Sequence, residues 1–599
     1  MPRGVLFGSS SLRQWMQGLR WSIIADLGLL AAIPLVQAMI NDDWLFSPIG
    51  WYDPWYYLGY ALNYADPTFL NDYYKISRLP WIFAEIAARN LCSPTVASWI
   101  LQIGTLALGS SSLYLLFTRT LGRSIAFLAA AVFAAFPFAH SSGGADYHNT
   151  LAGPLYAMSW WLAIRCAELG ETRARLFWLG VVLALTFHSC IVFAGLLPVL
   201  LLHYVWAYRD AHRCWPPIFK TLIPLAAGGI AITIVLGVIN VSVGRDFLFF
   251  MLQFNLAASF AGDSSLAKTW WLPWSSGWLW TAQYLGVLAA ALLVALITLI
   301  AANRQKPKHT QAMMYSAGYI LAVLSWVLWQ TQGQVTLSWV YFAYPLAFPF
   351  SGAVAASFAY WARADRPLHA LAKLTICAML IGVLAYSGHI NEEFRLFPAK
   401  PFSEALIVGL VYGFCVICIR NQMVRFWGGA AALAVCIAYS NNWYQSYVPA
   451  SCPLPRFGEN AIDASHRFIR AAQRSLSVPF NRVFLWADND ELMPVTPCAG
   501  RTIDLMNFEH SLAFTGFNHL EPPWGSPNVE GISEQRLKEV AFRPNLIVYV
   551  TARPERVDQL MRRFGEVGAA ASEKEFQILD TGALKVPIYT FTVHGSKQS

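Results

Sequence analysis

The sequence predicts a polytopic α-helical membrane protein of about thirteen spans, with a soluble α/β domain at its C-terminal end. Of the 599 residues, 56% are hydrophobic and only 13% are charged, about half the charged share of soluble proteins. The 25 Trp, 25 Tyr and 38 Phe suit aromatic belts at two membrane interfaces. Apolar runs of bilayer length continue to residue 440, after which the composition turns polar. We therefore expect a membrane domain over residues 1–440 and a soluble domain over residues 441–599.

Basic residues stand in short clusters between the apolar runs, as the positive-inside rule expects of cytoplasmic turns. The net charge of +8 is therefore no sign of nucleic-acid binding. Arg3, Arg13 and Arg20 precede the first apolar run, which we interpret as an uncleaved anchor with a cytoplasmic N-terminus. Asp26 falls within this run near its cytoplasmic end, where we expect it to reach the interface.

Single spans are expected wherever an apolar run separates loops on opposite sides of the membrane. These runs are 21–40, 96–117, 124–139, 151–169, 222–243, 279–302, 313–330, 340–361, 371–387, 405–419 and 426–440. The run 176–208 is too long for one ordinary span, and both of its flanks are basic. It is expected to form a hairpin of two short helices with its apex near His188. A single strongly tilted helix is the alternative, and it would invert the topology downstream.

The C-terminal domain is placed on the outer side of the membrane by the parity of the spans. Strand-like runs occur at 482–486, 545–550 and 586–593, and helical patterns at 461–475 and 554–564, which together predict a small α/β domain. Its two cysteines, Cys452 and Cys498, each stand beside a proline. We expect them to form a disulfide, because an outer compartment is oxidising.

The first outer loop, residues 41–95, is where we expect the chemistry. Its stretch 41–82 carries five aspartates followed by two cations among many Trp and Tyr: Asp42, Asp43, Asp53, Asp66, Asp72, Lys75 and Arg78. Carboxylates beside a bilayer are costly unless they are solvated, paired, bound to a metal or used in a reaction. Acids with a cation downstream could activate a hydroxyl group and hold a lipid phosphate. An ordinary acidic interfacial loop is the alternative interpretation.

Three further polar positions face the same side. The short loop 140–150, HSSGGADYHNT, holds Asp146 and His148, which could share a divalent cation, although Asp146 could equally cap the next helix. His188 at the hairpin apex is either a substrate contact or part of a structural hydrogen bond. The loop 244–277 carries Arg245 and the segment TWWLPW, whose aromatic residues favour an interfacial belt over sugar stacking.

The order of these motifs resembles the C-type glycosyltransferase superfamily (GT-C), the membrane enzymes that take sugars from polyprenyl-phosphate carriers. The segment YDPWYYLGYALNY, with Tyr57 and Ala61 at spacings of four and eight from Asp53, is similar to the first loop of protein O-mannosyltransferases and lipid A aminoarabinose transferases. Its Asp-Pro-Trp tripeptide, DPW, also resembles the first-loop motif of oligosaccharyltransferase catalytic subunits. YKISRLPWIF resembles the basic segment before the next helix in the aminoarabinose transferases. Asp146 stands where the superfamily often has a second acid, and His188 where it often has Lys.

Two departures limit what the resemblance implies. Pro54 replaces the second acid of the usual pair, so Asp42 or Asp43 could supply that role. The oligosaccharyltransferase motif WWDYG is absent, which makes N-linked protein glycosylation an unexpected activity.

The resemblance implies an inverting glycosyltransferase at the outer face of the bacterial inner membrane. Asp53 would be the general base, with Asp42, Asp43 and Asp146 as further catalytic candidates. Lys75 and Arg78 would bind the donor phosphate, and substrate contacts would come from Tyr57, His148, His188 and Arg245. The partners would be membrane lipids, a polyprenyl-phosphate sugar, and a lipid, glycan or protein acceptor.

A metal ion is a further possibility. Mg²⁺ or Mn²⁺ would use Asp53, Asp146 and His148 as candidate ligands, but we expect no strict dependence because the acids lack a clear ligand set. A flippase of lipid-linked sugars and a non-catalytic scaffold are the competing functions. A transporter would be expected to show charges in mid-span and paired repeats, neither of which is apparent.

Overall fold

The computed structural model describes a helical part and a C-terminal sheet. The residues described are 21–40, 53–62, 64–65, 67, 74–92, 94–135, 148–169, 172–261, 280–303, 310–332, 342, 344–362, 482–487, 518–519, 529–551, 553–580 and 585–595. The boundary expected at residue 440 and the three spans expected after residue 370 lie outside this set. The cysteines of the expected disulfide, Cys452 and Cys498, do so too.

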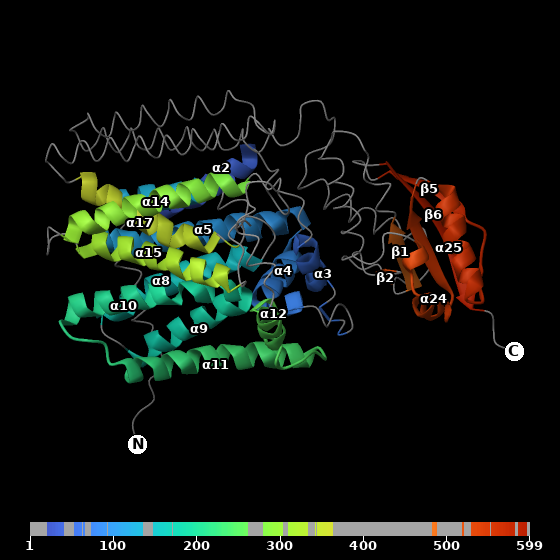
Figure 1. Cartoon of the computed structure of the whole chain (residues 1–599), viewed down its shortest axis with the longest axis horizontal. Helices are drawn as coiled ribbons and strands as arrows, with labels where there is room; N and C mark the ends of the chain where they lie inside the picture. Colours follow the sequence, from blue (N-terminus) through green and yellow to red (C-terminus); the bar gives the residue numbers. More distant parts are fainter. Residues whose placement is uncertain are drawn as a thin grey trace, which may run out of the picture.

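The helical part is a bundle whose long helices run side by side (Figure 1). They are α2 (Trp21–Ile40), α5 (Pro94–Thr120), α6 (Arg123–Ala135), α8 (His148–Leu169), α9 (Arg173–Ser189), α10 (Leu197–His212), α11 (Ile218–Ser242), α14 (Trp280–Asn303), α15 (Thr310–Thr331) and α17 (Ala347–Ala362). Among the described residues, 4 helices are long and apolar enough to cross a membrane: Val96–Thr120, Ile191–His212, Phe219–Ser242 and Thr310–Thr331. The expected fold class, a polytopic helical membrane protein, is confirmed.

The long apolar run 176–208 is divided into two helices, as expected. Helix α9 ends at Ser189, Cys190 is extended (φ −153°, ψ 108°), and a 3₁₀ turn, η2 (Ile191–Leu196), leads into α10. An extended residue cannot continue the helical ladder, so the chain breaks there. The alternative of one tilted helix is wrong.

Asp26, which was expected to reach the interface, is paired with Arg123, whose side chain is 49% exposed. Its side chain accepts two hydrogen bonds from Arg123 of α6, at 2.5 Å and 2.7 Å, and one from the Tyr114 hydroxyl of α5. Asp26 is 8% exposed. A carboxylate in an apolar helix is tolerated when it is bidentately paired, and this pair joins α2 to the α5–α6 turn.

Helices α9 and α11 approach each other closely through glycines. A Cβ atom at Gly180 would lie 1.9 Å from the carbonyl oxygen of Leu225, and one at Gly228 would lie 1.9 Å from the carbonyl oxygen of Phe177. Both distances are far below contact, so only glycine allows this backbone spacing. Small residues at a crossing are the usual means of close helix packing in membranes.

Alanine at Gly180 or Gly228 is therefore expected to push α9 and α11 apart. We expect each variant to lose about 1–3 kcal/mol of stability and to melt several degrees below the parent in detergent. Gly229→Ala is the matched control, because its Cβ would meet its nearest atom at an ordinary 3.6 Å. Equal melting temperatures for Gly228→Ala and Gly229→Ala would contradict the close crossing.

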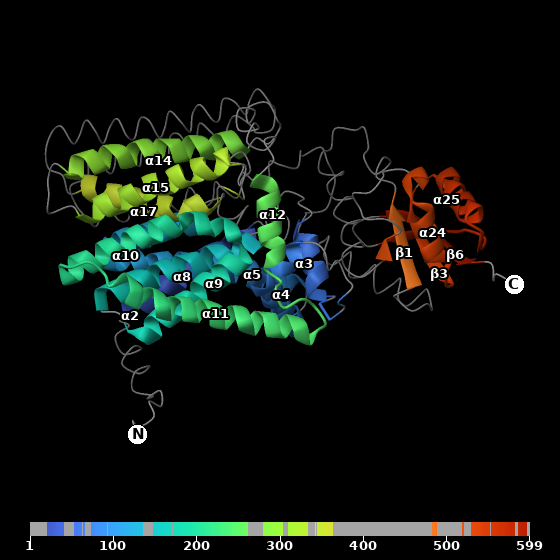
Figure 2. The same ribbon diagram turned by 60° about the horizontal axis from the view of Figure 1, so that its bottom comes forward.

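The outer loops expected from the sequence contain helices. Residues 41–95 include α3 (Asp53–Leu62), the 3₁₀ turn η1 (Tyr74–Ser77) and α4 (Leu79–Leu91), and the expected loop 244–277 contains α12 (Met251–Ala261). Figure 2 shows α3, α4 and α12 together at one end of the bundle. They share a hydrophobic cluster with the ends of α9 and α11 that includes Tyr57, Trp81, Leu236 and Phe249. Burial of that shared face explains why these segments fold as helices.

The C-terminal part is a 6-stranded sheet with two helices, which confirms the expected α/β character. The strands are β1 (Val483–Ala487), β2 (Asn518–His519), β3 (Asn545–Val550), β4 (Ala569–Ala571), β5 (Glu575–Asp580) and β6 (Lys585–Gly595). The path is β2-β1-β3-β6-β4, with β5 also on β6; β1 is parallel to β2 and β3, and β6 is antiparallel to its neighbours. Helices α24 (Glu534–Ala541) and α25 (Pro554–Glu566) supply buried residues to its core.

Strands β1, β3 and β6 and helix α25 coincide with the expected runs, whereas α24 and the short strands β2, β4 and β5 were not expected. The helix expected at 461–475 lies outside the described residues. The side of the membrane on which this domain lies stays a prediction.

Candidate functional site

The two cations of the first loop lie together at the α3–α4 junction. The turn η1 carries Lys75, and Arg78 is the N-terminal cap residue of α4. Lys75 is only 2% exposed, and its Nζ lies 4.3 Å from the centre of the Tyr56 ring. A buried ammonium group is costly in an apolar medium, and a facing aromatic ring offsets part of that cost.

Arg78 is fixed by tyrosines on both sides. Its Nη1 donates to the Tyr57 hydroxyl oxygen at 2.5 Å, and its Cζ lies 5.1 Å from the centre of the Tyr74 ring. Tyr57 belongs to α3 and is fully buried. The structure therefore brings together two residues that the sequence separates by 21 positions, one a predicted phosphate ligand and the other a predicted substrate contact.

Asp53 is the first residue of α3, one helical turn before Tyr57. Residues four apart in a helix share a face. The predicted base and the hydroxyl group that holds Arg78 thus belong to adjacent turns of one helix. Pro54 follows in the first turn, where its missing N–H group costs no hydrogen bond.

His188 ends α9 within a hydrogen-bonded frame. Thr233 Oγ1 donates its one proton to the Gly229 carbonyl at 2.9 Å, so it accepts from His188 Nε2 at 2.7 Å. The imidazole also packs against Phe249 and Phe250, with ring centres 5.1 Å and 5.9 Å away. The structural hydrogen bond that the sequence left open is formed through Nε2, and substrate contact by His188 stays a prediction.

Arg245 ties the α11–α12 connection to the first loop. It is 4% exposed, its Nε donates to the Tyr64 carbonyl at 3.2 Å, and its Cζ lies 5.5 Å from the centre of the Tyr64 ring. The Tyr64 hydroxyl in turn donates to Asn240 Oδ1 at 2.9 Å. Burial raises the pKa of Tyr64 to about 12, against the opposing charge of Arg245, so the phenol remains a donor at neutral pH. These contacts make Arg245 a link between segments; its contact with substrate stays a prediction.

A buried ion pair on α4 was not expected. Glu85 is 0% exposed and lies 3.6 Å from Arg89, whose Nη2 donates to Ser98 Oγ of α5 at 3.5 Å. A Glu and an Arg four residues apart in a helix are recognisable from the sequence as an ion pair, but such pairs are normally exposed to solvent. Their burial follows from the packing of α4 against α5, which no local pattern reveals.

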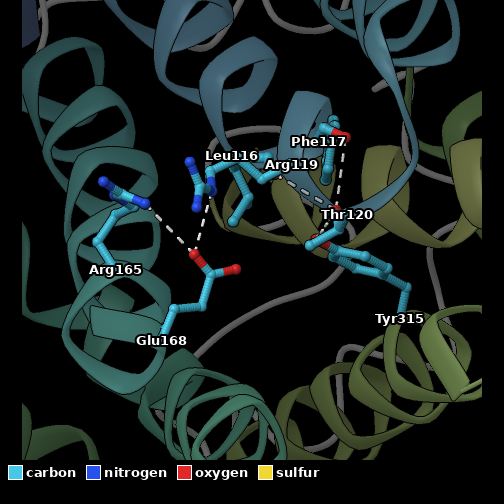
Figure 3. A network of polar contacts seen from close by, with 7 residues as sticks. All are labelled: Leu116, Phe117, Arg119, Thr120, Arg165, Glu168 and Tyr315. Carbon is cyan, nitrogen blue, oxygen red and sulfur yellow. Dashed lines mark hydrogen bonds and ion pairs between the residues drawn. The ribbon is translucent and has the colours of Figure 1, made fainter. Parts of the chain in front are cut away.

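A second polar network lies at the end of α5 remote from α4 (Figure 3). Arg119 of α5 and Arg165 of α8 contact the same oxygen of Glu168, at 3.1 Å and 3.4 Å, and Thr120 Oγ1 lies 2.8 Å from the Tyr315 hydroxyl of α15. Arg119 and Arg165 are among the basic residues between apolar runs, for which the sequence predicts a cytoplasmic position. One carboxylate joins α5 to α8 at this end, while the cations of η1 stand at the other end.

The side chains of the remaining candidate residues are not among those that the structure describes. Asp42, Asp43 and Asp146 lie outside the described residues, and His148 begins α8 without a described side chain. Across the part of the chain that the structure describes, no group of three or more His, Cys, Asp or Glu could hold a metal ion. The side chains of the candidate ligands Asp53, Asp146 and His148 lie outside the described set, and metal binding by them stays a prediction.

Comparison with known proteins gives structural likeness only. No family model matches the sequence, and no curated protein sequence matches it. The structure of ArnT from Cupriavidus metallidurans in the apo state aligns over 94% of this chain and 97% of that chain, with a TM-score of 0.49 and 11% identity. The structure of the same protein bound to undecaprenyl phosphate aligns over the same shares, with a TM-score of 0.48 and 12% identity.

Proposed function

We propose that this chain is a membrane glycosyltransferase that transfers a sugar from a polyprenyl-phosphate donor to a lipid, glycan or protein acceptor. The observation that carries the proposal is the cationic turn at residues 75–78. There Lys75 and Arg78 are held by tyrosines at one end of an apolar helix bundle, next to the helix that begins with Asp53. We place this end at the outer face of the bacterial inner membrane.

The donor phosphate would bind at Arg78 and Lys75. A guanidinium group matches the paired oxygens of a phosphate, and charge-assisted bonds are stronger than neutral ones. Tyr57 and Tyr74 contact the guanidinium from two directions, which limits its rotamers before a ligand arrives. The isoprenoid chain would lie along the apolar helices, since the bundle end is where a lipid headgroup meets water.

The chemistry would be a single displacement. The acceptor hydroxyl attacks the anomeric carbon, the bond from that carbon to the phosphate oxygen breaks, and polyprenyl phosphate leaves with the bonding electrons. Asp53 would take the acceptor proton as general base, and one displacement inverts the anomeric configuration. Asp42, Asp43 and Asp146 are the alternative bases, and Mg²⁺ or Mn²⁺ could assist the leaving phosphate.

The proposal is tested by binding and turnover in detergent. Undecaprenyl phosphate is expected to bind the purified protein, whereas undecaprenol, which has the same chain without the phosphate, should bind far more weakly. Incubation with an undecaprenyl-phosphate sugar and a panel of acceptors should release undecaprenyl phosphate. Equal affinity for undecaprenyl phosphate and undecaprenol would contradict the proposal. Movement of the intact lipid-linked sugar across reconstituted vesicles, with no cleavage, would make the protein a flippase.

A further inference from the structure

The break after α9 leaves backbone carbonyls that no helical N–H group can satisfy. In a continuing helix the carbonyl of His188 would accept from residue 192, but η2 begins at Ile191 after the extended Cys190. Buried carbonyls of this kind need another donor, because an unpaired one costs as much as a lost hydrogen bond. The donor in this structure comes from a distant helix.

Gln253 of α12 supplies that donor. Its Nε2 donates to the His188 carbonyl at 3.2 Å and to the Ser77 carbonyl at 3.5 Å. Gln253 is 5% exposed, so the amide group is enclosed by protein. The Ser77 carbonyl belongs to the peptide bond that leads directly to Arg78. One side chain therefore joins the end of α9 to the cationic turn.

We propose that Gln253 is a positioning residue for the phosphate-binding cation Arg78. The proposal rests on the function proposed above. The Tyr57 hydroxyl oxygen accepts a hydrogen bond from the guanidinium group of Arg78, and the Gln253 amide donates one to the Ser77 carbonyl, which directly precedes Arg78 in the backbone. A side chain fixed at both ends keeps its charge in one place, which lowers the cost of ordering it when a phosphate binds.

The packing around Gln253 supports this role. Phe249 and Phe250, just before α12, cover the His188 ring, and that ring is bonded to Thr233 of α11. The end of α9 is thus held by α11 and is a fixed point against which Gln253 can hold η1. An amide is needed here because the side chain must donate to carbonyl oxygens, which a carboxylate of the same size cannot do when ionised.

A double-mutant cycle tests the inference, with the dissociation constant for undecaprenyl phosphate as its readout. Gln253→Met removes the donor at similar volume and should weaken binding about tenfold, leaving the KM for the acceptor unchanged. In an Arg78→Ala background the same change should weaken binding less than about twofold, because Gln253 acts through Arg78. Gln330→Met removes an amide that is 2% exposed on α15 and should leave binding unchanged.

The outcomes are separable. An equal loss from Gln253→Met in both backgrounds would show that the residue does not act through Arg78, and no loss in either would remove the inference. If Arg78→Ala binds undecaprenyl phosphate as well as the parent does, the proposed function fails instead. If Gln253→Met does not fold, Gln253→Leu, which also lacks a hydrogen-bond donor, replaces it in the cycle; parental affinity in that variant would overturn the inference.

Discussion

Replacement of Asp53 by Asn is expected to lower sugar-transfer turnover by about two to four orders of magnitude, the usual contribution of a positioned general base. Asparagine keeps the size of the side chain and most of its hydrogen bonds but cannot accept a proton. Asp53 begins α3, and a polar residue is retained at that helix start. The protein should therefore fold, and the loss should appear in kcat.

Affinity for the donor separates this role from a binding role. Asp53→Asn should bind undecaprenyl phosphate as the parent does, because the carboxylate serves the acceptor. Asp43→Asn and Asp42→Asn are the matched acids of the same loop. If Asp43→Asn abolishes turnover while Asp53→Asn retains it, the base has been assigned to the wrong carboxylate. If all of these variants turn over normally, the acidic loop is only a membrane interface.

Arg78→Ala is expected to weaken binding of undecaprenyl phosphate by about ten- to a hundredfold, since a charged hydrogen bond contributes about 1.5–3 kcal/mol. It should also slow turnover, because the departing phosphate loses the partner that stabilises its charge. Binding measured with the purified protein, and kcat measured with saturating donor, report the two effects separately. Both effects should shrink as salt is added, because the residue is partly exposed.

Two variants grade the Arg78 effect. Arg78→Lys keeps the charge but loses the planar fork, so it should fall between the parent and Arg78→Ala. Tyr57→Phe keeps the arginine and removes only its hydrogen-bond acceptor, and should cost a smaller factor than Arg78→Ala. Arg209→Ala is the control for the loss of one positive charge. Arg209 lies in α10, and its guanidinium group lies over the ring of Trp215, which follows that helix. Equal losses from Arg78→Ala and Arg209→Ala would mean that net charge, not this site, attracts the lipid.

The sequence alone was sufficient where the signal is local. Runs of about twenty apolar residues have one way to satisfy their backbone in a bilayer, so α2, α5, α8, α11, α14 and α15 appear where the pattern places them. The division of residues 176–208 followed from length and from basic flanks. Strands β1, β3 and β6 could be predicted because each is a short apolar run rich in β-branched and aromatic residues, which is the pattern of a buried strand.

The contacts that build the candidate site were decided by the tertiary structure. Helix α12 was expected to be part of a loop between two spans; it packs against η1 and contacts the end of α9 through Gln253. The burial of Glu85 follows from the packing of α4 against α5, and the hydrogen bond from Gln253 to the Ser77 carbonyl joins segments 176 residues apart. The sequence indicated Lys75 and Arg78 because charges beside a membrane carry a local cost, and it indicated Tyr57 through the resemblance of its motif to known transferases. It could not name their supports, because a hydrogen bond between distant segments depends on how whole helices pack and leaves no periodic trace in the chain.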